Sequence, residues 1–404
     1  MKNVFFTSVE SAIKDIELGK MIIIANNSDI KNEGNLVCAA ERISHRIINF
    51  MVKHARGLIC VPMKHERLKE LKIDNMVESS IEKEKCSFTI SVDYKLETTT
   101  GISAYDKVVT TIKKLIDKTT KSEDFIKPGY VFPLKYNEGG VLVKSGYAEA
   151  IIDLVNLAGL YPAGVVCKIM NDCGTVTRMI NLIKFAEKYK LKIITIDEII
   201  KYRRTTEKLV IEVVNVDLPT KYGDFRLICF ENVITKDFHL AVVKGNVKNK
   251  QNVLVRVHSS CETGDIFHSL RCDCGEQLKI ALTIIGQIKQ GVILYMHQEG
   301  RGIGLINKLK AYSLQEKGMD TVEANIALGF APDLRDYWIA SQILHELGVK
   351  SVNVMTNNPQ KIMSLKEYGL KITKRIPLEI TPTSANIKYL KTKMIKMGHI
   401  LEIV

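Results

Sequence analysis

Apolar residues recur along the chain at two periods, which predict helices and strands in alternation. Spacings of three and four residues place Val9, Ala12 and Ile16 on one face of a helix predicted over residues 7–19, with Ser8 as its N-cap. Short apolar runs predict buried strands, and strict alternation predicts a half-buried strand over residues 88–94. The predicted helices are 7–19, 41–56, 177–188, 276–289 and 336–347, with others after Gly101, after Ser145 and from Asn358; the predicted strands are 21–25, 58–61, 88–94, 141–143, 164–170, 252–257, 292–296 and 351–356.

The chain is long enough for two domains. Its 404 residues exceed what one hydrophobic core usually serves. The polar segment 202–208 interrupts the pattern, so we predict a boundary between residues 1–204 and 205–404. Residues 209–257 read as mostly extended. We therefore expect an α+β protein with two domains, each a mixed β-sheet with packed helices.

Composition restricts the class of protein. Residues are 46% hydrophobic and 25% charged, as in soluble globular proteins, and no apolar run reaches the eighteen residues of a membrane span. The first ten residues lack the features of a signal peptide, which predicts a cytoplasmic protein. The net charge is +13, but the lysines are spread out and not interleaved with aromatic residues, so no nucleic-acid partner is expected. A general cationic field suits phosphorylated small molecules.

Cysteine provides the first candidate chemistry. Nine cysteines, an odd number, fit a reducing compartment, and six of them are predicted to be small core residues: Cys38, Cys60, Cys86, Cys167, Cys173 and Cys229. Cys261, Cys272 and Cys274 instead cluster among polar residues. Three thiolates with a fourth position open are typical of catalytic zinc. A structural zinc with a further ligand and buried free thiols are the alternatives, and a tight turn, aided by Gly275, is needed to direct Cys272 and Cys274 at one ion.

Three further segments could hold an anion. The glycine-rich loop 298–304 follows a predicted strand and pairs Glu299 with Arg301 where backbone amides can approach phosphates, although a simple tight turn is the alternative. Thr356 and Lys361 flank a predicted helix N-terminus, where unpaired N–H groups favour anions. Asp333 and Arg335 precede another helix, where an N-cap aspartate and a solvated arginine are equally ordinary.

Together these segments resemble one enzyme family. Residues 209–404 are similar to GTP cyclohydrolase II of riboflavin biosynthesis, in the blocks Arg256-Val-His-Ser, Arg271-Cys-Asp-Cys-Gly, Gln298-Glu-Gly-Arg-Gly-Ile-Gly-Leu, Asp320-Thr-Val-Glu-Ala-Asn, Asp333-Leu-Arg-Asp-Tyr, Thr356-Asn-Asn-Pro and Tyr389-Leu-Lys-Thr-Lys. The resemblance implies hydrolysis of GTP to formate, pyrophosphate and 2,5-diamino-6-(5-phosphoribosylamino)pyrimidin-4-one. It also implies a homodimer.

The resemblance implies roles for particular residues. Cys261, Cys272 and Cys274 would hold one zinc per C-terminal domain, which activates the water that attacks guanine. Arg335 would attack the α-phosphate with Asp333 as its base, or would only stabilise charge, because deprotonating arginine is costly; Tyr312 would assist ring opening. GTP, with Mg²⁺ on its phosphates, would contact Arg256, Val257, His258, Ser259, Ser260, Gln277, Glu299, Gly300, Arg301, Thr321, Thr356 and Lys361. Ser260 stands where the family usually has glutamate, and Trp338 replaces a small residue; we expect activity to survive both.

Residues 3–203 resemble a second family, 3,4-dihydroxy-2-butanone 4-phosphate synthase. The shared segments include Asn32-Glu-Gly, Ala39-Ala-Glu, Ala55-Arg-Gly-Leu-Ile-Cys, Thr99-Thr-Gly-Ile-Ser-Ala and Leu157-Ala-Gly-Leu-Tyr-Pro-Ala-Gly. The family's charged and metal-binding positions are altered, however, to Ile30, Lys31, Asn35, Tyr147 and Lys168. Magnesium requires oxygen ligands, so we expect this domain to be catalytically inactive. The alternatives are a fully bifunctional enzyme, a sugar-phosphate sensor using Lys31, Lys144 and Lys168, and a nucleotide-binding regulator without catalysis.

Overall fold

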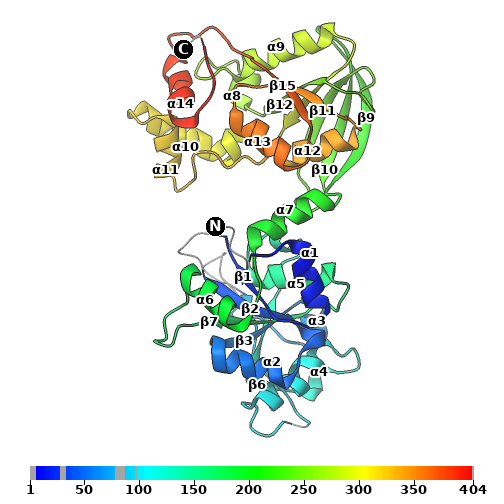
Figure 1. Cartoon of the computed structure of the whole chain (residues 1–404). Helices are drawn as coiled ribbons and strands as arrows, with labels where there is room; N and C mark the ends of the chain where they lie inside the picture. The colour runs from blue at the N-terminus through cyan, green and yellow to red at the C-terminus, as the bar shows by residue number, and fades with distance from the viewer. Residues whose placement is uncertain (1–5, 28–32, 78–86, 97, 403–404) are drawn as a thin grey trace. The chain divides into compact units, whose positions relative to one another are not determined.

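The computed structural model describes residues 6–27, 33–77, 87–96 and 98–402. These form two compact units, Met1–Arg203 and Arg204–Val404 (Figure 1). Each unit contains a β-sheet with both parallel and antiparallel strand pairs, and helices pack against both sheets. The predicted α+β class with mixed sheets is confirmed.

The N-terminal unit is built on a sheet in the order β4-β6-β3-β7-β2-β1-β8, with β5 beside β6. Its strands are β1 (Ile22–Ala25), β2 (Gly34–Ala39), β3 (Arg56–Met63), β4 (Ser87–Phe88), β5 (Val92–Tyr94), β6 (Phe125–Lys135), β7 (Gly164–Ile169) and β8 (Ile193–Thr195). Its α-helices are α1 (Val9–Glu17), α2 (His45–Phe50), α3 (His65–Glu70), α4 (Lys113–Ile116), α5 (Tyr147–Leu157), α6 (Met179–Tyr189) and α7 (Ile196–Thr206). Short helical turns are η1 (Ala40–Arg42), η2 (Met51–Ala55), η3 (Asp106–Ile112), η4 (Ser122–Asp124) and η5 (Gly140–Leu142).

Two hydrophobic cores lie on opposite faces of this sheet. Successive strand side chains point to opposite faces, so Ile22 and Ile24 of β1 pack with α1 and α5 while Ile23 packs with α2 and α6. Both faces of β1 and β2 are therefore buried, which explains the unbroken apolar sequence of β1.

Local predictions in this unit had mixed outcomes. Ser8 caps α1 by accepting the N–H of Ser11, as predicted. The strand predicted at 141–143 is wrong: Gly139 and Gly140 adopt positive φ and turn the chain into η5. The helix predicted over 41–56 is interrupted, because Ile43 is extended between η1 and α2 and the last turn is π-helical. The predicted strand 88–94 is divided between β4 and β5.

The C-terminal unit has the sheet order β15-β14-β12-β13-β11-β10-β9. Its strands are β9 (Val210–Thr220), β10 (Gly223–Asn232), β11 (Phe238–Lys244), β12 (Val253–Ser259), β13 (Gly291–Met296), β14 (Val352–Met355) and β15 (Ile372–Ile376). Its helices are α8 (Glu262–Asp265), α9 (Cys274–Gln287), α10 (Gly304–Glu316), α11 (Thr321–Ala327), α12 (Trp338–Glu346), α13 (Pro359–Glu367) and α14 (Ile387–Met397), with the turn η6 (Glu299–Gly302). The predicted N-cap Asn358 accepts the N–H of Gln360 at the start of α13.

The parallel part of this sheet determines where chemistry can assemble. Strands β13, β12 and β14 are neighbours, run in the same direction, and end at Met296, Ser259 and Met355. The loops that follow carry Cys261, the glycine-rich segment and Thr356. Ligands of α/β sheets usually bind at the carboxyl ends of parallel strands. Three segments far apart in sequence therefore meet at one edge of the sheet.

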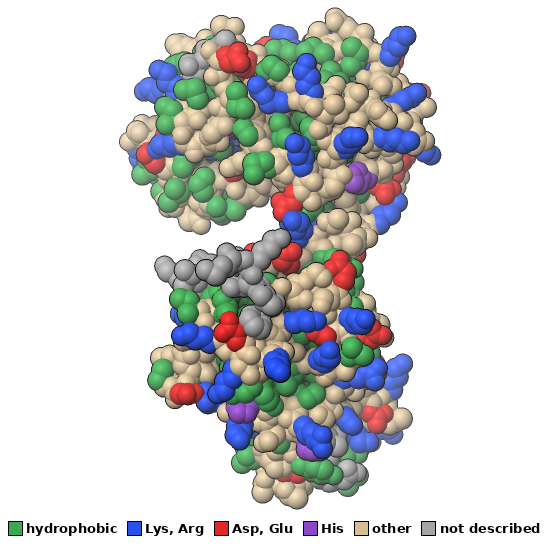
Figure 2. Space-filling model, in the orientation of Figure 1, with side chains coloured by type: hydrophobic (Ala, Val, Ile, Leu, Met, Phe, Trp, Pro, Cys, Tyr) green, Lys and Arg blue, Asp and Glu red, His purple; other side chains and the backbone are tan. Residues whose placement is uncertain are grey.

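The distribution of surface charge, the lengths of the helices and the burial of the other cysteines were also predicted from the sequence. Lysine and arginine side chains are scattered over the visible face of both units in Figure 2. Within the described ranges, no helix has the length and apolar character needed to cross a membrane. Cys38, Cys60 and Cys167 are buried as predicted, Cys229 is half-buried, and Cys173 is exposed, so the core assignment of Cys173 is wrong. Cys86 lies outside the described residues.

The buried ion pair of Asp153 with Arg203 allows a prediction about the stability of the N-terminal unit. Its carboxylate is 2% exposed and accepts hydrogen bonds from Arg203 (2.7 Å), the Val141 N–H (2.8 Å) and the Tyr136 hydroxyl (3.2 Å). Burial raises the pKa of Asp153 to about 6 even though Arg203 favours the ionised form. Removing one member of a buried ion pair typically costs about 3–5 kcal/mol, and we expect that loss in the free energy of unfolding for Asp153→Ala.

Urea unfolding of the whole chain measures this loss by circular dichroism. Trp338, the one tryptophan, reports the C-terminal unit by fluorescence, and its transition should not move. The control is Asp172→Ala, which removes an exposed ion pair with Arg56 and should cost less than about 1 kcal/mol. Equal losses in the two variants would contradict the expected role of Asp153.

Candidate functional site

The side chains of Cys261, Cys272 and Cys274 converge on one point. Their sulfur atoms all lie within 4.8 Å of one another, and those of Cys261 and Cys272 are 3.7 Å apart. Sulfurs bound about 2.3 Å from a tetrahedral zinc ion are separated by about 3.8 Å. Among the described residues, this is the one group of three or more histidine, cysteine or acidic residues with metal-binding geometry. The donor set and its spacing fit zinc.

Gly264 and Gly275 allow the three cysteine side chains to come close to one another. Cys261 precedes α8, Cys272 lies in a turn and Cys274 begins α9, so the last two are not on an extended strand. A Cβ atom on Gly264 would lie 2.8 Å from the Cys272 sulfur, and one on Gly275 would lie 2.3 Å from the Gly264 carbonyl oxygen. Any larger residue at either position would displace backbone or a sulfur.

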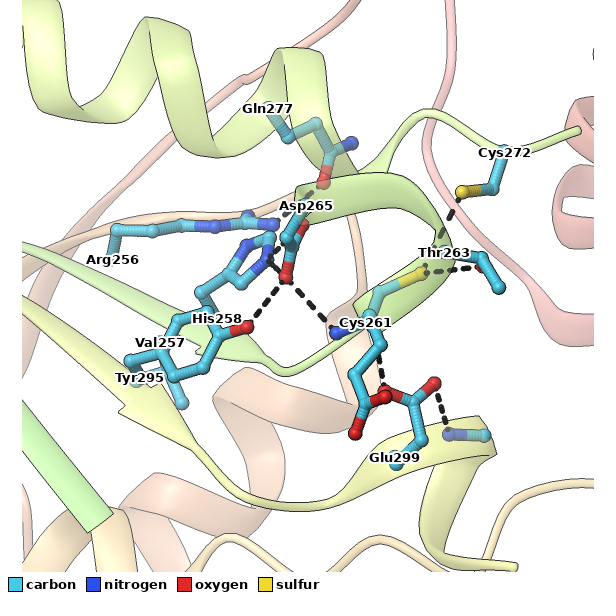
Figure 3. Close-up of polar contacts among 12 residues, drawn as sticks. Arg256, Val257, His258, Cys261, Thr263, Asp265, Cys272, Gln277, Tyr295 and Glu299 are labelled. Atoms are coloured by element: carbon cyan, nitrogen blue, oxygen red, sulfur yellow. Dashed lines mark hydrogen bonds and ion pairs between the residues drawn. The ribbon is translucent and has the colours of Figure 1, made fainter. Parts of the chain in front are cut away.

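Asp265 fixes the loop that carries Cys261 (Figure 3). Its buried carboxylate accepts hydrogen bonds from the Cys261 N–H (2.9 Å), the Tyr295 hydroxyl (3.0 Å) and His258 Nε2 (3.1 Å). A carboxylate can only accept, so His258 Nε2 carries the hydrogen. Burial lowers the pKa of His258 in spite of Asp265, and the ring is therefore neutral. The Nε2 of His258 thus holds the cysteine loop, and the predicted contact of His258 with GTP stays a prediction.

Glu299 and Lys308 attach the glycine-rich segment to the cysteines. The Glu299 carboxylate accepts hydrogen bonds from the N–H groups of Glu262 (2.8 Å) and Gly300 (3.1 Å). Lys308 donates from Nζ to Glu299 (2.6 Å), to the hydroxyl of Thr263 (2.9 Å) and to the Cys261 sulfur (3.1 Å). A buried ammonium thus lies directly beside a candidate metal ligand.

A pocket with about 1100 Å³ of empty space, part of it open to solvent, lies beside the thiols. It is lined by most of the predicted residues: Arg256, His258, Ser259, Ser260, Gln277, Glu299, Gly300, Arg301, Tyr312, Thr321, Arg335, Thr356 and Lys361, together with the three cysteines. Val257 and Asp333 do not line the pocket. The carbonyl oxygen of the buried Val257 accepts a hydrogen bond from Lys361 Nζ (2.7 Å), and the Asp333 carboxylate accepts one from Arg335 Nε.

The pocket carries an excess of positive charge. The buried donors Arg256 Nε and Arg301 Nη2 have no partner among the described residues. Burial and the charges of Arg256 and Arg335 lower the pKa of Lys361 well below its ordinary value. Burial, with Lys393, Arg335 and Lys361, likewise lowers the pKa of His399 to about 3. Uncompensated positive charge is costly in a buried site, so the pocket favours a polyanion.

Arg335 and Asp333, the pair that the resemblance implies for the phosphate step, form an ion pair with two hydrogen bonds between their side chains. Arg335 donates to Asp333 from Nε (2.9 Å) and Nη2 (2.5 Å). Burial would raise the pKa of Asp333, but the hydrogen bonds and charge of Arg335 outweigh it and lower that pKa. Burial opposes the charge of Arg335, yet Tyr337 and Asp333 raise its pKa. The guanidinium is therefore firmly protonated in this arrangement.

Other predicted residues have definite partners. The Tyr312 hydroxyl lies 3.2 Å from that of Thr263, close to the thiols. Gln277 accepts from Arg256 (2.6 Å) and donates to Asp273 (2.8 Å). Thr321 begins α11, and the Thr356 hydroxyl accepts the Asn358 N–H. Trp338, which stands where the family has a small residue, is buried, and the Arg204 guanidinium lies 5.2 Å from the centre of its ring.

Several site residues were not predicted from the sequence. Asp265 and Tyr295 hold the Cys261 loop, Lys308 contacts its sulfur, and the buried Lys393 pairs with Asp273 at 2.5 Å. Lys393 belongs to a segment that carried the family resemblance, so a signal existed without a role attached to it. Asp265 follows Cys261 by only four residues, but no spacing rule singles it out.

The altered positions of the N-terminal unit form an ion-pair cluster. Lys168 Nζ contacts the Glu33 carboxylate at 2.9 Å, and Arg178 contacts it at 3.3 Å. The Tyr147 hydroxyl donates to the Glu33 carbonyl oxygen (3.2 Å), and the Lys168 ammonium lies 4.7 Å from the centre of the Tyr147 ring. Asn35 is the strand partner of Lys168. Ile30 and Lys31, the other altered positions named from the sequence, lie outside the described residues.

Comparison with protein families matches both halves of the chain. The GTP cyclohydrolase II family matches residues 211–377, and the 3,4-dihydroxy-2-butanone 4-phosphate synthase family matches residues 10–202.

Whole-length relatives are also similar. The chain is 67% identical over 402 residues to the riboflavin biosynthesis protein RibBA of Endomicrobium trichonymphae, with all of both chains covered. It is 48% identical to RibBA of Chlorobium phaeovibrioides, covering 99% of this chain and 98% of that protein. Among solved structures, RibBX of A. baumannii, a two-domain 3,4-dihydroxy-2-butanone 4-phosphate synthase, is 32% identical with a TM-score of 0.69, covering 92% of this chain and 99% of that one.

The Asp265 contacts generate a stability prediction. Asp265→Ala leaves three donors without their acceptor, and each buried unsatisfied group costs about 1–3 kcal/mol, so we expect a loss of at least about 3 kcal/mol in the free energy of unfolding. Tyr295→Phe removes one of the three contacts and should cost about 1 kcal/mol. Trp338 fluorescence during urea unfolding measures both. Similar losses in the two variants would show that Asp265 does not organise this loop.

Proposed function

The chain belongs to the family of bifunctional riboflavin biosynthesis proteins, in which a 3,4-dihydroxy-2-butanone 4-phosphate synthase unit precedes a GTP cyclohydrolase II unit, and on that premise we propose that its C-terminal unit hydrolyses GTP. The products are formate, pyrophosphate and 2,5-diamino-6-(5-phosphoribosylamino)pyrimidin-4-one. The observation that carries the proposal is the placement of three converging thiols on the wall of a cationic pocket.

Cys261, Cys272 and Cys274 hold one zinc ion in this proposal. When bound, zinc lowers the pKa of a coordinated water towards neutrality and so supplies a nucleophile at physiological pH. The pocket residues bind and orient the nucleotide. The unpaired donors of Arg256 and Arg301 and the ammonium of Lys361 suit the triphosphate, whose negative charge restores the balance that burial disturbs. Mg²⁺ enters with the phosphates.

Two residues near the thiols and phosphates complete the mechanism. The Tyr312 hydroxyl, beside Thr263 and the thiols, is placed to hand a proton to or from the opening purine ring. Arg335 lines the pocket, paired with Asp333, and in this proposal it contacts the phosphates of GTP. Its raised pKa favours stabilisation of phosphate charge over nucleophilic attack, which would require Asp333 to remove a proton that the pair holds firmly.

We also propose that the N-terminal unit is catalytically inactive. Glu33 retains its carboxylate, but Lys168 and Arg178 neutralise it, and Lys168 is a cation where the family has an acid. A magnesium ion would have to displace an ammonium that is covalently part of the site. The rival is the fully bifunctional enzyme, which the names of the RibBA relatives favour.

Zinc content and product release test the C-terminal proposal. We expect stoichiometric zinc and formate release from GTP in the wild type. In Cys272→Ala we expect zinc affinity and formate release to fall by more than about 100-fold, because the two thiols that remain are too few to hold the ion. Arg335→Ala should keep zinc and lose pyrophosphate release. Cys229→Ala, a half-buried cysteine of β10, is the control and should match the wild type. Zinc and formate release persisting in Cys272→Ala would refute the metal assignment, and zinc-bound wild type that binds GTP without formate release would indicate a regulator.

Ribulose 5-phosphate tests the N-terminal proposal. The whole chain with added Mg²⁺ should release no formate from ribulose 5-phosphate, because the site lacks the ligands that magnesium needs. Formate release from GTP by the same preparation shows that the protein is folded and active. Turnover of ribulose 5-phosphate at a rate comparable to that of GTP would establish the bifunctional enzyme instead. The homodimer stays a prediction, which sedimentation analysis of the whole chain measures.

A further inference from the structure

We propose that Lys308 is a positioning residue of the metal centre, whose ammonium fixes the Cys261 thiolate and offsets the negative charge of the site. The inference rests on the proposed zinc site. Neither the resemblance nor the spacing of the sequence assigned Lys308 a role, and it lies 47 residues from the cysteine that it contacts.

The hydrogen bonds of Lys308 are made within the protein, although the residue also lines the pocket. An ammonium has three hydrogens to donate. Lys308 Nζ has three acceptors, namely Glu299 at 2.6 Å, Thr263 at 2.9 Å and the Cys261 sulfur at 3.1 Å. Every donor is thus engaged within the protein, and no N–H remains for a phosphate or a purine. The contact with Cys261 must therefore have a structural or electrostatic purpose.

Charge supplies that purpose. A zinc ion with three thiolates carries a net charge of −1, and the carboxylate of Glu299 adds another negative charge close by. Without Lys308 the group would carry −2; with it, the group carries −1. The Lys308 side chain is 10% exposed and that of Glu299 is 11% exposed, so solvent screens this charge poorly. The ammonium reduces the repulsion that three closely spaced thiolates and a carboxylate would otherwise experience.

A hydrogen bond to sulfur also changes the ligand itself. An N–H donor draws electron density away from a thiolate, which makes the sulfur a slightly weaker donor to the ion. The same hydrogen bond holds the sulfur in position and its charge reduces the repulsion among the thiolates, and these two effects are the larger, so losing the donor weakens metal binding. Partners of metal ligands typically change metal affinity by about 10–100-fold when removed. The same effect is visible in cobalt-substituted sites, where a sulfur richer in electrons absorbs at longer wavelength in its charge-transfer band.

Helix α10 supplies a matched control. Lys310 lies two residues after Lys308 on the same helix, and its side chain is exposed. Lys310→Met removes the same charge and adds the same apolar group without touching the cysteines. Lys308→Gln keeps a hydrogen-bond donor but loses the charge, and Lys308→Arg keeps both. The set separates charge, hydrogen bonding and ordinary helix effects.

Two measurements on the whole chain test the role. Zinc affinity is determined by competition with a chromogenic chelator, and the charge-transfer spectrum is recorded with Co²⁺ in place of zinc. We expect Lys308→Met and Lys308→Gln to bind zinc about 10–100-fold more weakly and to shift the cobalt band to longer wavelength. Lys308→Arg should recover most of the affinity, and Lys310→Met should equal the wild type. Urea unfolding followed by Trp338 fluorescence confirms that each variant is folded.

The outcomes are distinguishable. Wild-type affinity and an unshifted band in both Lys308→Met and Lys308→Gln would overturn the inference while leaving the zinc site in place. An equal loss in Lys310→Met would also overturn it, because the effect would then belong to the helix. Should Lys308→Met fail to fold, the comparison of Lys308→Gln with Lys308→Arg decides. A wild-type protein that binds neither zinc nor cobalt would refute the proposed function itself, and the inference with it.

Discussion

Three sulfur atoms within 4.8 Å of one another repel when they are ionised, and much of the C-terminal unit serves to hold them there. Gly264 and Gly275 permit the approach, because a side chain at either position would collide with a sulfur or with backbone. Asp265 anchors the Cys261 N–H, and Lys308 contributes a positive charge on the other side of the same residue. Each of these contacts involves burying a polar or charged group, which is tolerable only because its partner is also fixed. The cluster is thus stabilised as a network and not by any one bond.

The sheet brings the other components to the cluster. Parallel neighbours β12, β13 and β14 end at the same edge, so loops separated by roughly a hundred residues share one pocket. The left-handed backbone of Arg301, with φ of 62°, is unusual for a residue with a side chain and places strain at the pocket. Such strain persists only where surrounding contacts determine the conformation. Here the Arg301 carbonyl accepts the Leu334 N–H (3.0 Å), and its guanidinium donates to the Pro332 carbonyl oxygen (3.4 Å).

The sequence predicted the fold class and the segments of the site better than it predicted contacts. Strands buried on both faces, such as β1, are plain in the sequence because every residue is apolar. Strand β6 was not predicted, since Pro128 and Gly129 in its middle are typical of turns. The three cysteines and the cationic residues carried strong chemical signals. Asp265, Tyr295 and Lys308 did not, because an aspartate, a tyrosine and a lysine are common everywhere and only the tertiary fold brings them to a cysteine.

The ion pairs at Glu33 have a different implication for the N-terminal unit. An enzyme that borrows its cation from solution depends on the supply of that ion and can be stripped of it by a chelator. Here Lys168 and Arg178 provide the positive charge next to Glu33 as part of the polypeptide. The positive charge beside this carboxylate is therefore part of the polypeptide and does not depend on the magnesium content of the surroundings.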